Sequence, residues 1–294
     1  MSFQQDYQLI KQTVSTEINF VENKMVENIS LSEPLNSSLK KFLLGKSKRI
    51  REVLPILYVK AFGRSLNENQ LEVLSIVEIV HNASLIHDDI IDESDLRRGQ
   101  KTVSFEFGSK LAVIAGDYLL SLALEKLCKI ANVDIIKQFA ATIKNMCVGE
   151  VEQNYARFKK GTLEEYIEKT KNKTAYLFET AFLTCAMADG NSQYDLKSLS
   201  RLGLAIGIAF QIRDDLLNMT DVDNSKPANS DINSGIYNAP VILGSESDNY
   251  ASGIEKTKGL LNNYIEQAKN ELKLLPENSY SLALYRCLEL LNNV

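Results

Sequence analysis

The feature that most constrains this chain is an interval of 171 residues without proline, between Pro55 and Pro227. Proline is excluded from helix interiors because it lacks an amide hydrogen and clashes with the preceding turn. The 294 residues include only 5 prolines and 14 glycines, and they rarely cluster, which argues against a fold with many tight turns. We therefore expect an all-α fold without a linker, and a single domain over residues 1–294.

Apolar residues recur every three or four positions in most segments, as on one face of a helix. This spacing predicts helices near residues 3–29, 36–62, 68–90, 109–130, 133–158, 163–188, 195–219, 249–273 and 278–292. No segment alternates strictly enough to predict a strand. Asp195 and Thr162 are expected N-caps, Thr162 in a capping box with Glu165. The longest segment predicted as non-helical, 220–248, is polar and follows an acidic pair, as functional lids often do.

Composition limits the partners and the compartment. The net charge of −5 provides no basic field for nucleic acid, and the N-terminus has no apolar core like that of a signal peptide. The apolar run Leu202–Phe210 is too short to span a bilayer, so no integral membrane segment is expected. The four cysteines form no C-x-x-C pair and sit among apolar residues, which predicts buried free thiols in a reducing cytoplasm.

The first candidate site is the string HNASLIHDDIID, which starts at His81. Asp88 and Asp92 are four residues apart, so on a helix their carboxylates lie on one face and repel each other. A divalent cation between them would offset that repulsion, and ligands that are all oxygen favour Mg²⁺ over zinc. A solvated acidic helix end is the alternative, but the residues before the motif are largely apolar.

A second acidic pair, Asp214 and Asp215, ends another apolar helix in the string FQIRDDLLN. Asn218 repeats the four-residue spacing and Gln211 precedes Asp214 by one turn. Gly203 and Gly207 on the same stripe leave room either for a close helix or for a cavity. Two such helices could face each other across a cleft in which bound Mg²⁺ keeps coordination positions for substrate phosphates.

Basic residues cluster beside these motifs. Residues 45–51, GKSKRIR, contain four cations, and Arg97-Arg98 follows shortly after Asp92. Lys171, Lys173 and Lys226 lie in two further strings. Arginine and lysine bind phosphate oxygens, so an acidic metal cleft flanked by these cations fits a diphosphate substrate.

Together these strings resemble the trans-isoprenyl (polyprenyl) diphosphate synthase family. The matched strings are GKSKRIR, EIVHNASLIHDDIIDESDLRRGQKTVSFEFG, AVIAGDYLL, GEVEQ, NKTAYLF, FQIRDDLLN and SKPANSDINSGIYNAP, which cover roughly residues 45–240 in family order. The resemblance implies a helical bundle around a central cavity, a homodimer, and three Mg²⁺ ions. It also implies head-to-tail condensation of isopentenyl diphosphate with an allylic diphosphate.

The resemblance also implies roles for individual residues. For the metal ions these are Asp88, Asp89, Asp92, Asp214 and Asp215. For the allylic diphosphate they are Arg97, Lys173, Gln211 and Lys226, and for isopentenyl diphosphate Lys48, Arg51, His81 and Arg98. Phe210 matches the aromatic residue beside the reacting alkenes. The chain departs from the family pattern at Ser47, Glu52, Asn218, Ile236 and Asn238, where glycine, proline, aspartate, lysine and threonine are common.

The length of the polyprenyl product is predicted from the residues one helical turn before the first acidic motif. Ala83 and Ser84 are small, where short-chain members of the family carry bulky aromatics, and Val80 and Val77 continue the stripe. Small side chains leave space that a close-packed aromatic would fill, so we expect a medium- or long-chain product. The resemblance to the family implies a length of about six to eight isoprene units. The alternative is that Ala83 and Ser84 only pack against another helix.

Three other functions stay open. A short-chain synthase would stop at farnesyl or geranylgeranyl diphosphate. A catalytic or regulatory subunit of a heteromeric synthase would explain Asn218, although the intact first motif and Arg97-Arg98 argue against a silent subunit. A terpene cyclase would carry a serine and a glutamate after Asp214 at positions where this chain has neither.

Overall fold

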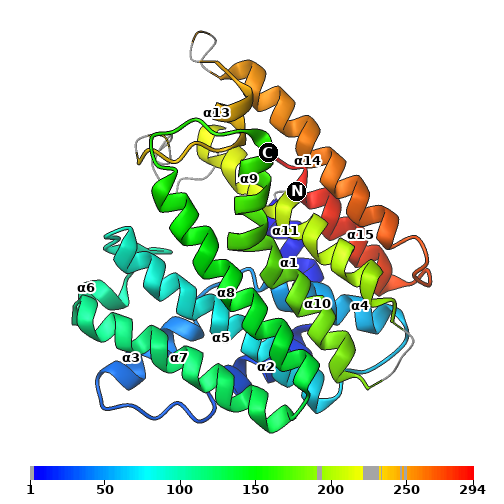
Figure 1. The fold of residues 1–294 in the computed structure, drawn as a ribbon. Coiled ribbons are helices and arrows are strands. Elements are labelled where there is room, and N and C mark those ends of the chain that lie inside the picture. Colours follow the sequence, from blue (N-terminus) through cyan, green and yellow to red (C-terminus); the bar gives the residue numbers. More distant parts are fainter. Residues whose placement is uncertain (1–2, 191–193, 221–231, 233, 246, 248–249) are drawn as a thin grey trace.

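Helices make up nearly all of the regular structure that the computed structural model describes, over residues 3–190, 194–220, 232, 234–245, 247 and 250–294 (Figure 1). The all-α prediction is therefore confirmed. The helices are α1 (Phe3–Gln12), α2 (Ser15–Val26), α3 (Leu35–Leu43), α4 (Ile50–Ala61), α5 (Glu68–Ile91), α6 (Val103–Phe107), α7 (Ser109–Ile130), α8 (Val133–Tyr155), α9 (Leu163–Thr170), the π-helical turn η1 (Lys171–Ala175), α10 (Tyr176–Ala188), α11 (Leu196–Thr220), α13 (Ala239–Leu243), α14 (Ala251–Glu271) and α15 (Ser279–Leu291). None of these helices has both the length and the apolar character needed to cross a bilayer.

Two long predicted helices are interrupted. The helix predicted over 3–29 breaks at Thr13, whose hydroxyl donates to the Ile10 carbonyl at 2.7 Å and so competes with regular helix bonding. The helix predicted over 36–62 breaks between α3 and α4, where Arg49 has the left-handed backbone angle φ 56°. The segment predicted over 163–188 is one helical rod, but it contains η1.

Other differences are local. The chain forms two strands of two residues each, β1 (Leu96–Arg97) and β2 (Gln100–Lys101), which pair antiparallel although no strand was predicted. The segment predicted as non-helical, 220–248, contains α13. The prediction of buried thiols is wrong for Cys128 and Cys147, which are exposed on α7 and α8, and right for Cys185 and Cys287.

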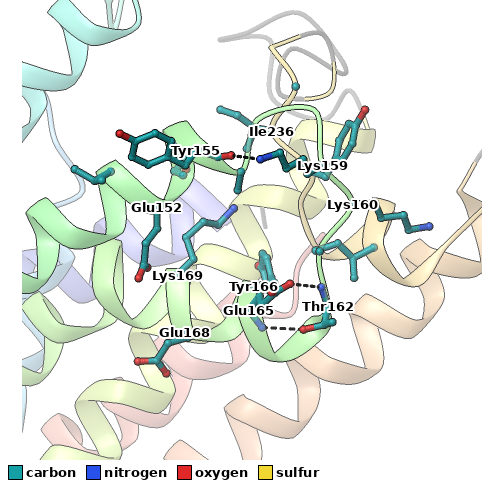
Figure 2. Close-up of a pocket in the computed structure, with 17 residues that line it drawn as sticks. Glu152, Tyr155, Lys159, Lys160, Thr162, Glu165, Tyr166, Glu168, Lys169 and Ile236 are labelled. Carbon is teal, nitrogen blue, oxygen red and sulfur yellow. Dashed lines mark hydrogen bonds between the residues drawn. The ribbon is translucent and has the colours of Figure 1, made fainter.

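Capping residues set several helix ends. Thr162 and Glu165 form the predicted capping box, with the Thr162 N–H donating to Glu165 Oε2 at 2.8 Å and the Glu165 N–H donating to Thr162 Oγ1 at 3.2 Å (Figure 2). Asp195 Oδ1 accepts the N–H of Lys197 at 2.9 Å ahead of α11, as predicted. These bonds satisfy backbone donors that helices otherwise leave unpaired at their first turn.

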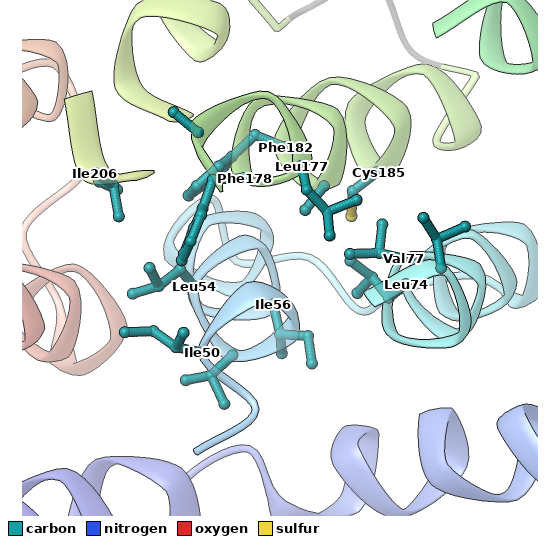
Figure 3. Close-up of a cluster of buried hydrophobic side chains, with 14 of the residues drawn as sticks. Ile50, Leu54, Ile56, Leu74, Val77, Leu177, Phe178, Phe182, Cys185 and Ile206 are labelled. Carbon is teal, nitrogen blue, oxygen red and sulfur yellow. The ribbon is translucent and has the colours of Figure 1, made fainter. Parts of the chain in front are cut away.

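The core surrounds α5, which packs against α2, α4, α7 and α10. Between Val73 and Ala83 most side chains of α5 are buried, as expected of a helix that neighbours enclose on all sides. Figure 3 shows Leu74 and Val77 of α5 facing apolar side chains of α4 and α10. Helix α11 packs on the other side of α10, so the bundle holds both acidic motifs on rigid neighbouring elements.

Candidate active site

Two pockets adjoin where the C-terminal end of α5 meets the second half of α11. The pocket that we call the cationic pocket has a volume of about 900 Å³ and is lined by the 45–51 loop, His81, Arg98 and Phe210. The pocket that we call the acidic pocket has a volume of about 210 Å³ and is lined by both acidic motifs and by η1. Leu85, Arg97 and Asp214 line both pockets, so ligands bound in the two pockets would lie side by side.

The first motif terminates α5 at the edge of the acidic pocket. Asp92 is the C-cap of α5, its N–H donates to the Asp88 carbonyl at 2.8 Å, and both side chains line the pocket as predicted. Burial raises the pKa of Asp88 to about 6, with Lys173 and Arg97 opposing the shift. A buried carboxyl with a raised pKa lacks a compensating positive charge, which a bound cation would supply.

Asp89 has a different position from its neighbours. It is buried, it lines neither pocket, and its Oδ1 accepts a hydrogen bond from Arg97 Nε at 2.7 Å. Burial raises the pKa of Asp89, whereas the Arg97 guanidinium lowers it. The structure therefore gives Asp89 the role of holding Arg97 at the boundary between the pockets.

The β1–β2 hairpin presents the two arginines. Arg98 and Gly99 form its turn with φ of 53° and 74°, the positive values that a tight two-residue hairpin requires. Arg98 lines the cationic pocket, and its Nη1 donates to the Lys46 carbonyl at 3.3 Å. Of the two adjacent arginines, Arg98 therefore lines only the cationic pocket, whereas Arg97 lines both pockets.

The two carboxylates of the second motif differ in exposure and in hydrogen-bond partners. Asp214 is exposed and lines both pockets, whereas Asp215 is buried and accepts hydrogen bonds from Tyr166 Oη at 2.6 Å and Gln211 Nε2 at 2.9 Å. Gln211 Oε1 in turn accepts the Thr174 hydroxyl at 2.9 Å. Both polar atoms of the Gln211 amide, which the sequence analysis assigned to the allylic diphosphate, therefore already have partners within the protein.

The glycine stripe on α11 serves close helix packing. A Cβ at Gly207 would lie 2.5 Å from the Ala175 Cα, and one at Gly203 would lie 2.5 Å from the Glu179 Cα. Of the two readings left open by the sequence, a close helix is the one observed. The contact brings η1 against α11, so that Thr174 reaches Gln211.

Lys173 lies in the π-helical turn η1, a distortion that is common at functional sites. Its Nζ contacts Glu150 Oε2 at 2.6 Å, and both Lys173 and the carboxylates of the first motif face the acidic pocket. Gly149 permits this arrangement, because a Cβ there would lie 2.9 Å from the Lys173 nitrogen. Glu150 and Tyr166 are partners that the sequence analysis did not assign, although the string GEVEQ contains Glu150.

In the cationic pocket the cations have unequal roles. Arg49 is an internal anchor, since its Nη1 bonds Glu78 at 3.0 Å and its Nη2 bonds the Leu43 carbonyl at 2.6 Å. Arg51 stacks on the Phe178 ring with its Cζ 4.6 Å from the ring centroid. Its buried Nε has no hydrogen-bond partner among the described residues, which leaves a donor for a ligand.

Electrostatics keep His81 neutral. Burial lowers the pKa of His81 well below its usual value, and Arg51 and Arg98 add to the shift. Burial lowers the pKa of Arg51 to about 10, so Arg51 stays charged at neutral pH. Phe210 lies 5.9 Å from Lys48 Nζ and 5.5 Å from the Phe178 ring, between the cations and the core.

The remaining predicted residues differ in how they are placed. Lys226 lies outside the described residues. Ala83, Val80 and Val77 are fully buried in the core, whereas Ser84 is partly exposed and donates to the His81 carbonyl at 2.8 Å. None of these four lines either described pocket.

The carboxylates fit a Mg²⁺ site that waters and substrate phosphates complete. Among the described residues, no three histidine, cysteine, aspartate or glutamate side chains are close enough to hold a metal ion by themselves. Mg²⁺ is commonly bound by one or two carboxylates and completed by waters and substrate phosphates. Asp88, Asp92 and Asp214 line the acidic pocket with carboxylate oxygens and match that mode, whereas both oxygens of Asp215 already accept hydrogen bonds from Tyr166 and Gln211.

Comparisons with known proteins agree with this geometry. Residues 32–277 match the family model described as polyprenyl synthetase. A prenyl transferase of Cyanidium caldarium is 31% identical, over 91% of this chain and 92% of that protein. Heptaprenyl diphosphate synthase component 2 of Geobacillus stearothermophilus is 31% identical, over 86% and 89%. The crystal structure of heptaprenyl diphosphate synthase from Staphylococcus aureus superposes with a TM-score of 0.87 at 25% identity, covering 96% of this chain and 98% of that one.

Other relatives are named for products from geranylgeranyl to solanesyl diphosphate, and some are chloroplastic or mitochondrial. The comparisons therefore agree on the type of reaction and differ on product length and compartment. The match to the family model covers most of the chain and includes the whole lining of the acidic pocket and the 45–51 loop, His81, Arg98 and Phe210 of the cationic pocket. The chain therefore belongs to the polyprenyl diphosphate synthase family, whose members are trans-prenyltransferases.

Proposed function

We propose that this chain condenses isopentenyl diphosphate with an allylic diphosphate, such as farnesyl or geranyl diphosphate, to give a medium- or long-chain all-trans polyprenyl diphosphate. The observation that supports this proposal is the adjoining pair of pockets, one cationic and one acidic, which share Arg97 and Asp214. Two phosphorylated substrates bound side by side would bring their reactive ends together. We propose one catalytic unit over residues 1–294.

The residues around the pockets can perform this reaction without a protein nucleophile. Arg97 and Lys173 neutralise the leaving diphosphate, which lowers the barrier to breaking its bond to the allylic carbon. Mg²⁺, held by Asp88, Asp92 and Asp214 together with the substrate, would supply further positive charge at the leaving oxygens.

The cationic pocket positions the second substrate. Lys48 and Arg51 hold isopentenyl diphosphate beside Phe210, whose ring face attracts the developing allylic cation. The isopentenyl alkene attacks that cation, and the proton lost afterwards goes to the released diphosphate. The neutral His81 can donate a hydrogen bond to a substrate oxygen without adding charge.

The raised pKa of Asp88 predicts pH-dependent metal binding. Asp88 has a pKa of about 6, so at about pH 5.5 only about a quarter of it is ionised and the apparent Mg²⁺ affinity should be about fourfold lower than at about pH 7.5. The sign follows because a proton and Mg²⁺ compete for one carboxylate. Thermal unfolding with and without Mg²⁺ at both pH values measures this, since a bound ligand raises Tm. Equal Mg²⁺-induced shifts at both pH values would contradict the assignment of Asp88.

For product length we propose about six to eight isoprene units, on the basis of the small side chains one turn before Asp88. Ser84→Phe should shorten the product by about one or more units, because a phenyl ring occupies about the volume of a five-carbon unit. Ser84 is the better position to test, since Ala83 is fully buried and Ala83→Phe would overpack the core at a cost of about 1–3 kcal/mol. The measurement is the chain length of radiolabelled products. An active Ser84→Phe variant with the wild-type distribution would favour the packing interpretation.

Assembly is the second part of the proposal. Large apolar side chains are exposed along α7 and α8, namely Leu111, Val113, Ile114, Leu124, Val148, Val151 and Tyr155. Apolar surface of this extent is typical of an interaction site, and we propose that a second copy of the chain covers it. The alternative is a heteromeric partner, which the similarity to a synthase component keeps in view.

One experiment tests activity and assembly together. The purified chain is incubated with Mg²⁺, isopentenyl diphosphate and farnesyl diphosphate, and its mass in solution is measured by light scattering. A dimer that forms polyprenyl diphosphate supports the proposal. A monomer that forms no product alone contradicts the homodimer and indicates a partner subunit, and a hydrocarbon product without diphosphate indicates a cyclase.

A further inference from the structure

We propose that the N-terminal helix α1 forms part of the site for isopentenyl diphosphate, and that its Tyr7 is a positioning residue that acts through the backbone of Lys48. This inference rests on the proposed function. It gives a role to a helix that lies outside the strings that carry the family resemblance and outside residues 32–277, which match the family model.

Helix α1 forms one wall of the cationic pocket. Tyr7 and Lys11, one helical turn apart, line this pocket together with the 45–51 loop. The same helix packs against the C-terminal helix α15 (Figure 1), where Arg286 Nη2 contacts Asp6 Oδ2 at 2.8 Å. The wall that α1 forms is therefore fixed on the bundle through contacts with the far end of the chain.

Two side chains of α1 donate hydrogen bonds to backbone carbonyls of the 45–51 loop. Tyr7 Oη donates to the Lys48 carbonyl at 2.9 Å, and Lys11 Nζ donates to the Ser47 carbonyl at 3.2 Å. Burial raises the pKa of Tyr7 well above its usual value, so the phenol keeps the hydrogen that it donates. Two consecutive carbonyls of the loop are thus held by α1.

The next residue of the loop has a strained backbone. Arg49 has φ 56°, a left-handed value that a residue other than glycine keeps only where its surroundings hold it. From inside the bundle, Glu78 and the Leu43 carbonyl bind the Arg49 guanidinium at 3.0 and 2.6 Å. From the pocket side, α1 holds the two carbonyls that precede the turn. The turn buries the Arg49 side chain, whereas Lys48 and Arg51 line the cationic pocket.

The direction of Lys48 matters for binding because its side chain is long and rotates about four bonds. Its Nζ lies 5.9 Å from the Phe210 ring centroid, beside the place proposed for the reacting alkenes. A cation whose backbone is held before the ligand arrives loses less entropy when it binds a phosphate. Because the Tyr7 hydrogen is already donated to the loop, Tyr7 contributes to binding through Lys48.

The test removes one hydroxyl and keeps the buried ring. Tyr7→Phe should weaken the binding of isopentenyl diphosphate to the full chain, measured by calorimetry, about 3- to 10-fold, the effect of one typical hydrogen bond. KM for isopentenyl diphosphate should rise by the same factor, while KM for farnesyl diphosphate changes less than about twofold. The effect is selective because Tyr7 lines the cationic pocket and not the acidic pocket.

Tyr118→Phe is the matched control. The Tyr118 hydroxyl also bonds the backbone of a distant loop, since it donates to the Asn28 carbonyl at 3.3 Å and accepts the Ser30 N–H at 2.9 Å, and Tyr118 lines neither pocket. This variant should lower Tm at least as much as Tyr7→Phe does, yet keep the affinity for isopentenyl diphosphate within about twofold of the wild type. A general loss of stability would affect binding in both variants alike.

A double-mutant cycle separates positioning from direct contact with the substrate. If Tyr7 acts through Lys48, adding Tyr7→Phe to a Lys48→Met variant should lower the affinity for isopentenyl diphosphate by less than about twofold further. A hydroxyl that touched the substrate itself would instead cost its full factor in either background.

Two results would overturn the role of Tyr7. One is an affinity of Tyr7→Phe for isopentenyl diphosphate within about twofold of the wild type. The other is a full additional loss when Tyr7→Phe is added to Lys48→Met. If the wild-type chain binds isopentenyl diphosphate but forms no product, the proposed function fails, whereas the binding comparison still decides the role of Tyr7.

Discussion

Replacing Asp88 with asparagine should lower kcat by about 10³-fold and leave the fold intact. The amide keeps the shape of the side chain but removes the charge that holds a cation at the leaving diphosphate, and the loss of one such electrostatic contact typically costs two to three orders of magnitude. The free energy of unfolding, in contrast, should rise slightly in this variant at neutral pH. A carboxyl whose folded pKa of about 6 lies above its usual value destabilises the folded chain at higher pH, and asparagine lacks that penalty.

The decisive measurement pairs turnover with Tm in the same samples. Asp88→Asn should be nearly inactive, should melt at or slightly above the wild-type Tm without Mg²⁺, and should lose most of the Mg²⁺-induced rise. Asp134→Asn is a suitable control because Asp134 is an exposed aspartate on α8 whose partner is Lys137. An Asp88→Asn variant that keeps more than about a tenth of wild-type kcat would contradict the role assigned here.

Replacing Arg51 with methionine should lower kcat/KM for isopentenyl diphosphate about 50- to 500-fold. A buried arginine that binds a phosphate contributes charge-assisted hydrogen bonds of about 2–4 kcal/mol. The effect should be confined to one substrate, because Arg51 lines only the cationic pocket. Arg51→Lys should recover part of the loss, since lysine keeps the charge but not the planar stacking on Phe178.

The pKa of His81 provides a readout that does not depend on turnover. Arg51 is the charged group that lowers the pKa of His81 most after burial itself, so Arg51→Met should raise that pKa. The chain has only 2 histidines, so the two imidazoles can be followed separately by NMR titration. Arg201→Met, at an exposed arginine paired with Glu271, should leave both kinetics and the titration unchanged. An unchanged KM for isopentenyl diphosphate in Arg51→Met would place that substrate elsewhere.

Sequence patterns were sufficient for the main outline of the site. The four-residue spacing of Asp88 and Asp92 predicted that their carboxylates would lie on one helix face, and in the structure both line the acidic pocket. The apolar helices ahead of Asp88 and Asp214 were likewise predicted to face each other across a cleft. These predictions succeed because helical periodicity alone decides which side chains share a face.

Sequence patterns could not distinguish neighbours of the same type. Asp88 and Asp89 are both carboxylates, yet one lines the acidic pocket and the other holds Arg97 in the interior. Arg49 and Arg51 are also alike in sequence, but Arg49 is enclosed by Glu22 and Glu78 while Arg51 keeps a donor unpaired. Which of two adjacent charges is enclosed depends on side chains from other helices, which no local pattern records.

The proline-free body and the apolar spacing by themselves determined that the chain is helical and that its acidic motifs lie on apolar helices, because backbone chemistry and periodicity act over a few residues. Only the tertiary structure decided how the site is assembled. The close approach of α11 to η1 at Gly207 brings Gln211 to Thr174, and the hairpin turn at Arg98 sets Arg97 between the two pockets. Tyr7 and Lys48, 41 positions apart in the sequence, meet at the cationic pocket for the same reason. Such contacts arise from packing between distant segments, and their free energy depends on burial that exists only once the chain has folded.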